Sequence, residues 1–190
     1  ATTRHKYAIN DFPLIPRYAV LDPKVTLTLP ASITATTGMD ALTHAIEGYT
    51  TKAAWEMTDM FHLKAIEIIS NSLRGAVDNT PEGREGMALG QYIAGMGFSN
   101  VGLGIVHSMA HKTGAAFEGG HIIHGAANAM YLPKVIKYNS KDPVAAERYA
   151  KIAKFINLKG ETTEELVDAL IAELRSMNDQ LNIPQGIKNY

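Results

Sequence analysis

The feature that most constrains the fold of this chain is a helical spacing of its apolar residues, which begins near Ala31. Met39, Leu42 and Ile46 recur three or four residues apart and therefore lie on one face of an α-helix. The same spacing continues toward the end of the chain and predicts further helices. They are expected over 54–77, from 81 to between 96 and 98, over 105–117, from about 124, over 143–156 and over 162–181.

Local signals mark the ends of several of these helices. Thr80–Pro81 and Asp142–Pro143 each combine a capping oxygen with a proline in the first turn, which is typical of a helix start. Thr162–Glu165 has the spacing of a capping box for the last helix, which Pro184 is expected to stop. Pro133 lies within the helix predicted from about residue 124, and we expect it to kink or break that helix.

The residues before this helical region have a different pattern. Tyr18–Leu21 is a short apolar run followed by the turn signal Asp22–Pro23, which predicts a short buried strand. Two short strands do not form a stable sheet alone, so we expect this segment to be the edge of a sheet whose other strands lie elsewhere. The sequence therefore predicts a mainly α fold over residues 30–190, with a short β fringe in residues 1–29.

The composition excludes several classes of protein. The chain of 190 residues has no cysteine, which excludes disulfides, thiolate zinc sites, cysteine-ligated iron–sulfur clusters and a cysteine nucleophile. The net charge of -1 gives no electrostatic basis for binding nucleic acid. No apolar run approaches the roughly 20 residues that span a bilayer, so we expect no membrane insertion. The lack of cysteine fits a cytoplasmic location.

Histidines and one aspartate form the candidate constellation for chemistry. Four of the seven histidines lie between residues 107 and 124. Asp40 with His44, and His107 with His111, each have a spacing of four, which places both side chains on one helix face. A further pair, three residues apart, follows at positions 121 and 124. Two helices that each present such a pair can form a metal site inside a bundle.

The residues alone leave two interpretations open. A histidine on an apolar helix face is usually a packed residue with one hydrogen bond, and we assign His5 and His62 to that role. Asp40 and His44 instead lie among alanine, leucine and isoleucine, where polar groups need a partner or a metal to offset their desolvation. Imidazole with one carboxylate suits Fe(II), Zn(II), Co or Ni, and disfavours Ca or Mg.

Three runs of the sequence resemble a known family. They are TGMDALTHAIEGY at Thr37–Tyr49, GQYIAGMGFSNVGLGIVHSMAH at Gly90–His111, and HGAANAM at His124–Met130. They resemble the signatures of the iron-containing (group III) alcohol dehydrogenases, in the order that the family has them. The similarity covers nearly the whole chain. It is closest to the branch of lactaldehyde reductases, propanediol dehydrogenases and butanol dehydrogenases.

The resemblance implies a metal site, with Fe(II) expected and Zn(II) as the alternative. The implied metal ligands are Asp40, His44, His107 and His124. Many relatives place the last ligand ten residues after the position of His111, which here is His121. We prefer His124, because Gly125 and Asn128 preserve the motif around it. His111 resembles the family histidine that lies beside the nicotinamide and the substrate, where it orients substrate or relays a proton.

The resemblance also implies an activity and a cofactor. Relatives interconvert a primary alcohol or diol and its aldehyde with NAD or NADP, while the metal polarises the substrate oxygen. They have an N-terminal α/β cofactor domain and a helical metal-binding domain. Residues 1–29 would then be a remnant of the first, and residues 30–190 most of the second, so we expect the chain to be a piece of a longer protein. Lys6 resembles the lysine that approaches the cofactor.

Other interpretations remain at this point. A related metal-dependent superfamily, which includes dehydroquinate synthases and glycerol dehydrogenases, has a similar two-domain plan. The Asp40–His44 run fits the iron-type alcohol dehydrogenases better. A helical interaction module or an inactive remnant is a different class, and a module of that kind is expected to purify without stoichiometric metal. Long helices with apolar faces also lead us to expect association into a homo-oligomer.

Overall fold

Helices form where the apolar spacing predicts them, and the mainly α prediction is confirmed. The structure is a computed structural model that describes residues 11–116 and 122–189, and this part of the chain contains seven α-helices. In chain order they are α1 (Ala31–Thr50), α2 (Glu56–Val77), α3 (Pro81–Val101), α4 (Ile105–Ala116), α5 (His124–Asn139), α6 (Pro143–Phe155) and α7 (Thr163–Gln180). Short 3-10 turns lie at Phe12–Leu14, Pro23–Thr26 and Ile187–Asn189.

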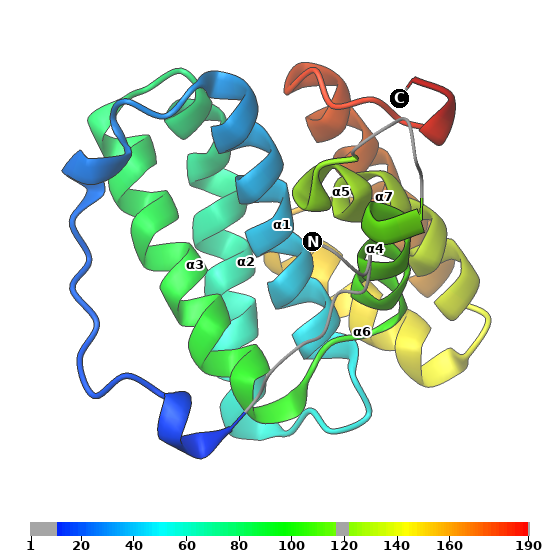
Figure 1. The fold of residues 1–190 in the computed structure, drawn as a ribbon. Helices are drawn as coiled ribbons and strands as arrows, with labels where there is room; N and C mark the ends of the chain where they lie inside the picture. The colour runs from blue at the N-terminus through cyan, green and yellow to red at the C-terminus, as the bar shows by residue number, and fades with distance from the viewer. Residues whose placement is uncertain (1–10, 117–121, 190) are drawn as a thin grey trace.

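The helices are arranged around α1. It packs against α2 and α3 on one side and against α5 and α6 on the other. Figure 1 shows α1, α2 and α3 side by side, with α4 to α7 grouped across from them. Within that second group α5 contacts α4 and α7, and α6 packs on α7. The contact between α1 and α5 therefore joins the two groups of helices.

One continuous apolar core connects these helices. Its largest fully buried side chains come from α1, α2, α5, α6 and α7, so both groups of helices contribute to it. They are Met39, Leu42, Ile46, Ile66, Ile69, Leu73, Met130, Leu132, Ile136, Ile152, Leu166 and Leu170. Among the helices of the described ranges, none combines the length and the hydropathy that a membrane span requires.

The predicted start signals act as caps. The Thr80 hydroxyl accepts a hydrogen bond from the Gly83 amide at 3.1 Å, at the beginning of α3. The Asp142 carboxylate does the same for α6. Thr162 and Glu165 form the expected capping box before α7. The Thr162 hydroxyl accepts from the Glu165 amide, and the Glu165 carboxylate accepts from the Thr162 amide. Each cap satisfies an amide that has no partner within its own helix.

The strand predicted at Tyr18–Leu21 is wrong for this structure. These residues have no regular secondary structure, and Tyr18 and Val20 are 89% and 90% exposed. A strand needs neighbouring strands for its backbone hydrogen bonds, and none occurs within residues 11–116 and 122–189. The apolar run is therefore exposed on the surface, and no strand forms in residues 11–29.

Pro133 was expected to kink or break its helix, and the break does not occur, because α5 continues through it to Asn139. Proline has no amide hydrogen, so it cannot bond the carbonyl four residues earlier, which belongs to Ala129. The Asn178 side chain on α7 donates to that carbonyl at 2.9 Å, and Asn178 is fully buried. A side chain from another helix thus replaces the missing backbone donor.

His62 on α2 is a packed residue, as its sequence context predicts. It is fully buried between α1 and α3. A Cβ added at Gly48 on α1 or at Gly97 on α3 would lie 2.2 or 2.4 Å from His62 Nε2, so the ring fits only between these two glycines. Neither ring nitrogen has a hydrogen-bond partner among the residues that the structure describes, in contrast to the single bond that we expected.

This packing predicts a loss of stability in acid. Burial lowers the pKa of His62 from an ordinary value of 6.5 to about 4, against a smaller opposing effect of Asp59. The unfolded chain therefore binds a proton at His62 below pH 6.5, whereas the folded chain binds it only below about pH 4. The stability due to the neutral ring is complete above pH 6.5 and decreases as the pH falls toward 4.

Urea unfolding at pH 7 and pH 4.5 tests this expectation with His62→Met, a change of similar volume. We expect the unmodified chain to lose roughly 2 kcal/mol more than the variant between these pH values. Other groups, His44 among them, titrate equally in both proteins, so only the difference reports His62. Parallel losses in the two proteins would contradict the prediction.

Candidate metal centre

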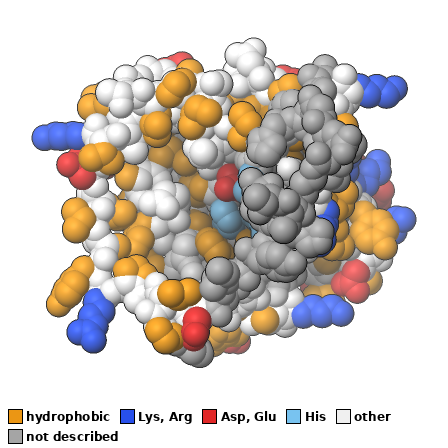
Figure 2. Space-filling view, viewed as in Figure 1, with side chains coloured by type: hydrophobic (Ala, Val, Ile, Leu, Met, Phe, Trp, Pro, Cys, Tyr) orange, Lys and Arg blue, Asp and Glu red, His pale blue; other side chains and the backbone are white. Residues whose placement is uncertain are grey.

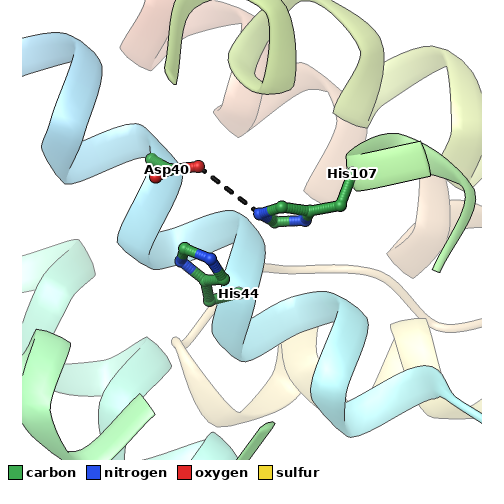
Figure 3. Close-up of side chains that lie close together, drawn as sticks. All are labelled: Asp40, His44 and His107. Atoms are coloured by element: carbon green, nitrogen blue, oxygen red, sulfur yellow. Dashed lines mark ion pairs between the residues drawn. The ribbon is translucent and has the colours of Figure 1, made fainter. Parts of the chain in front are cut away.

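Three helices bring the predicted ligands to one place. Asp40 and His44 lie one turn apart on α1, half-buried and on the side that faces α4 and α5. His107 lies in the first turn of α4 and is buried, and His124 is the first residue of α5. Figure 3 shows the side chains of Asp40 and His44 on α1 and that of His107 turned toward them. The ligand types therefore converge from segments far apart in the sequence.

The distances place the carboxylate of Asp40 against two imidazoles. Asp40 Oδ1 lies 3.4 Å from His107 Nε2, the pair that Figure 3 marks, and 3.6 Å from His124 Nε2. One possible ligand atom from each of Asp40, His44 and His107 can be chosen so that all three lie within 4.8 Å of one another. Such a spacing suits a small ion between them.

The ring of His44 is held between two other rings. It stacks on Phe98 of α3, with ring centroids 4.5 Å apart and planes inclined by 14°. The second neighbouring ring is that of His107, and its centroid lies 4.3 Å from the centroid of His44. Offset stacking of this kind restricts the ring orientation. His44 is thus positioned by α3 as well as by its own helix.

His111 lies at the edge of the same cluster. It follows His107 by one turn of α4, and its ring lies 6.2 Å from the ring of His107 and 5.0 Å from that of His124. The structure therefore places His111 beside the four predicted ligands. The remaining sequence candidates, Lys6 and His121, lie outside the described residues.

Asn128 is at the centre of the cluster. Its amide nitrogen lies 2.5 Å from Asp40 Oδ1 and 3.1 Å from both His107 Nε2 and His124 Nε2. The two hydrogens of this amide can serve only two of the three atoms at once, and all three atoms lie around the same small volume.

Glu47, on α1, supports His107 from behind. Its carboxylate accepts from the ring nitrogen Nδ1 of His107 at 2.8 Å and from the backbone amides of His107 and Val106 at 3.2 and 2.7 Å. The residue is 5% exposed. Glu47 follows His44 by three residues and Asp40 by seven, so all three lie on one stripe of α1.

The electrostatics of the cluster favour a positive charge. Burial raises the pKa of Asp40, but the hydrogen bond with His107 and the nearby His44 outweigh it, and the net pKa lies below the ordinary value. Burial lowers the pKa of His107, yet its hydrogen bonds with Asp40 and Glu47 raise the net value. Burial lowers the pKa of His44 to about 4, so its ring is neutral and has a free lone pair at pH 7.

The donor set fits a divalent transition metal. It offers one carboxylate and three imidazoles, a combination that Fe(II) and Zn(II) accept. Figure 2 shows histidine and acidic side chains recessed among other side chains on one face of the molecule. The arrangement can therefore hold an ion and bring a small oxygen-containing ligand beside it.

The sequence analysis missed two residues of this cluster, Glu47 and Asn128. Glu47 lies in the first family-like run and Asn128 in the third, and neither was assigned a role in the site. The sequence did contain a pattern that could have identified Glu47. A glutamate seven residues after Asp40 lies on the same helix face as the ligands, and it is flanked by Ile46 and Gly48. Asn128 follows His124 by one helical turn, which places it on the same face of α5.

The fold and the site define a helical domain with a partly buried carboxylate–histidine cluster between its helices. Residues 34–190 match the model of the C-terminal part of the Fe-containing alcohol dehydrogenase family. The chain therefore belongs to the Fe-containing alcohol dehydrogenase family. The resemblance described above is thereby confirmed.

Individual relatives agree with this assignment. The chain is 51% identical to the NADPH-dependent butanol dehydrogenase of Clostridium saccharobutylicum over 99% of its own length and 47% of that protein. It is 45% identical to the lactaldehyde reductase of Escherichia coli (strain K12), over 98% of the chain and 48% of the relative. The iron-containing alcohol dehydrogenase of Thermococcus thioreducens superposes with a TM-score of 0.84 at 33% identity, covering 93% of this chain and 44% of that one.

The chain spans about half the length of the curated relatives it matches. The matched relatives are named as dehydrogenases or reductases of alcohols, diols and aldehydes. They give no support to the dehydroquinate synthase and glycerol dehydrogenase alternative or to a helical interaction module.

Proposed function

We propose that this chain supplies the metal-binding part of an oxidoreductase that interconverts a primary alcohol or diol and its aldehyde with NAD or NADP. The observation that supports this most directly is the convergence of one carboxylate and three imidazoles in a member of the Fe-containing alcohol dehydrogenase family. Residues 30–190 form the metal-binding domain in this proposal, and residues 1–29 belong to the cofactor domain. Lys6 would approach the cofactor from there.

The proposed ligands are Asp40, His44, His107 and His124, with Fe(II) as the expected ion and Zn(II) as the alternative. One carboxylate and three neutral imidazoles leave a divalent ion with a net positive charge, so the bound ion would supply Lewis-acid polarisation of a substrate oxygen. His124 is preferred to His121 because its Nε2 lies 3.6 Å from Asp40 Oδ1.

The protein's own residues would orient the substrate and move a proton. His111 borders the cluster from α4, with its ring 5.0 Å from that of His124, so it is the candidate to orient a substrate oxygen or to relay a proton. The small alcohol or aldehyde would enter from the face seen in Figure 2. Association of several copies stays a prediction, which the exposed apolar side chains of Trp55, Met57 and Met60 support.

Metal content tests the proposed site. We compare the unmodified chain, purified without oxygen, with an Asp40→Ala, His124→Ala double variant and with Asp168→Ala, which removes an exposed aspartate on α7. The expected result is about one equivalent of iron or zinc in the unmodified chain and in Asp168→Ala. The double variant should lose it, because a carboxylate and an imidazole that face each other are removed.

Circular dichroism of all three proteins shows whether the double variant remains folded. Retention of stoichiometric metal by a folded double variant would rule out the assigned ligands. No metal in any of the three proteins would mean that the histidines of the cluster are packed residues rather than ligands.

A further inference from the structure

Glu47 is a buried carboxylate for which the proposed reaction has no direct use. Its side chain is 5% exposed, and it lies on the α1 stripe that also carries Asp40 and His44. A buried carboxylate is costly unless its charge is matched by hydrogen bonds, and a residue retained at such a position needs a physical reason. The contacts of Glu47 supply that reason.

Among the described residues, the N–H groups from which the Glu47 side chain accepts all belong to the start of α4. The first amides of a helix have no carbonyl partner within it, and α4 begins at Ile105. Glu47 accepts from the second and third amides of the helix, those of Val106 and His107, at 2.7 and 3.2 Å. A residue of α1 thus performs for α4 the task that a capping residue performs within its own helix.

The same carboxylate fixes the ring of His107. Nδ1 of His107 lies 2.8 Å from Glu47 Oε2, and a carboxylate only accepts hydrogen bonds, so Nδ1 carries the proton. When the ring is neutral, as a metal ligand must be, Nε2 on its other side is then the nitrogen with a lone pair. It lies 3.4 Å from Asp40 Oδ1 and 3.1 Å from the Asn128 amide nitrogen. The tautomer and the direction of the ring both follow from Glu47.

The approach of α4 to Glu47 depends on Gly104. A Cβ added at Gly104 would lie 2.6 Å from Glu47 Oε1 and 3.2 Å from its Cδ. Any larger residue there would have to push the carboxylate away from the first turn of α4. Gly104 therefore gives a second way to disturb the contact without changing Glu47 itself.

We propose that Glu47 is a positioning residue that holds the backbone and the ring of His107, so that Nε2 faces Asp40 as a ready metal ligand. This proposal rests on the metal site proposed above. The carboxylate itself would not be a metal ligand, because its oxygens accept from the start of α4. It acts through His107, as outer carboxylates generally orient ligand imidazoles.

The test measures metal binding by the full chain, with Co(II) as a spectroscopic probe and Zn(II) in competition with a coloured chelator. Glu47→Gln keeps the size of the side chain but replaces one acceptor oxygen by an NH2 group that faces donors. We expect Zn(II) affinity to fall roughly 10- to 100-fold and the visible spectrum of the Co(II) form to change. Gly104→Ala, with Glu47 intact, should weaken binding in the same direction.

Glu67→Gln is the matched control, because in the described part of the chain Glu67 pairs with the exposed Lys64 on α2 and does not contact the cluster. It should bind Zn(II) as the unmodified chain does. In the Zn(II)-loaded unmodified chain, long-range 1H–15N NMR should show Nδ1 of His107 as the N–H nitrogen and Nε2 as the coordinating one. That measurement needs no variant, so it remains decisive if Glu47→Gln fails to fold.

The role of Glu47 and the metal site itself can be refuted by different results. If the unmodified chain binds Zn(II) and a folded Glu47→Gln binds it with unchanged affinity and an unchanged Co(II) spectrum, the role of Glu47 is refuted while the metal site stands. Coordination of Zn(II) through Nδ1 of His107 would refute it as well. If the unmodified chain binds no metal, the proposed site fails and the role of Glu47 fails with it.

Discussion

Gly125→Ala is expected to destabilise the chain by about 3 kcal/mol or more and to weaken metal binding at the same time. A Cβ on Gly125 would lie 2.1 Å from the carbonyl oxygen of Thr36 and 2.6 Å from its carbonyl carbon. Both are backbone atoms of α1, so no side chain can rotate away and the two helices must separate. Gly125 follows His124 directly, and Thr36 precedes Asp40 by one turn. Separation would therefore pull His124 away from Asp40.

Gly95→Ala is the matched control for this change. Gly95 lies inside α3, and a Cβ there would have no other atom within 4 Å. Alanine in a helix interior is favoured over glycine, so we expect this variant to be more stable by about 0.5 to 1 kcal/mol. Urea unfolding and Zn(II) titration of both variants check the expectation. Equal stability of the two variants would show that α1 and α5 are not packed as closely as described.

Arg84→Met is expected to cost roughly 3 to 5 kcal/mol of unfolding free energy. The Arg84 guanidinium is 3% exposed and donates to Asn79 Oδ1 and to Thr34 Oγ1, both at 2.8 Å, and to the Leu29 carbonyl at 3.3 Å. It thereby ties the start of α3 to the start of α1 and to the turn after α2. Methionine fills much of the volume, but it removes all three bonds and leaves the buried Thr34 hydroxyl oxygen without this donor.

Arg74→Met separates this effect from the simple loss of an arginine. Arg74 also donates to two side chains, Glu173 and Gln180, but its own side chain is 38% exposed. Exposed ion pairs contribute little, so we expect this variant to lose less than about 1 kcal/mol. Urea unfolding at pH 7 compares the two. Similar losses in both variants would contradict the importance assigned to burial of Arg84.

The helices were predictable because their signals are local. Apolar spacing and caps such as Thr80, Asp142 and Thr162 lie within the segment whose structure they determine, and each predicted helix occurs in the structure. The two features that do not form, a strand at residues 18–21 and a helix break at Pro133, depended on distant residues. The apolar run at Tyr18–Leu21 needed partner strands, and the effect of Pro133 was changed by a helix that follows much later in the chain.

The candidate site was predictable in composition but not in geometry. The spacing of Asp40 and His44 placed them on one face of α1, and family-like runs pointed to His107 and His124. No local pattern states that α4 and α5 meet α1 at that face. Glu47 remained unassigned for the same reason, because its partners are amides some sixty residues later, and amides are invisible in a residue pattern.

The replacement of a backbone donor in α5 by Asn178 has a consequence for cooperativity. The turn that carries His124 and Asn128 ends at the Ala129 carbonyl, and α7 rather than α5 itself closes that bond. The hydrogen-bond ladder of α5 is therefore completed only while α7 is docked. Local opening of α7 leaves that turn without its last bond, so the site and a helix that contributes no ligand belong to the same cooperative unfolding unit.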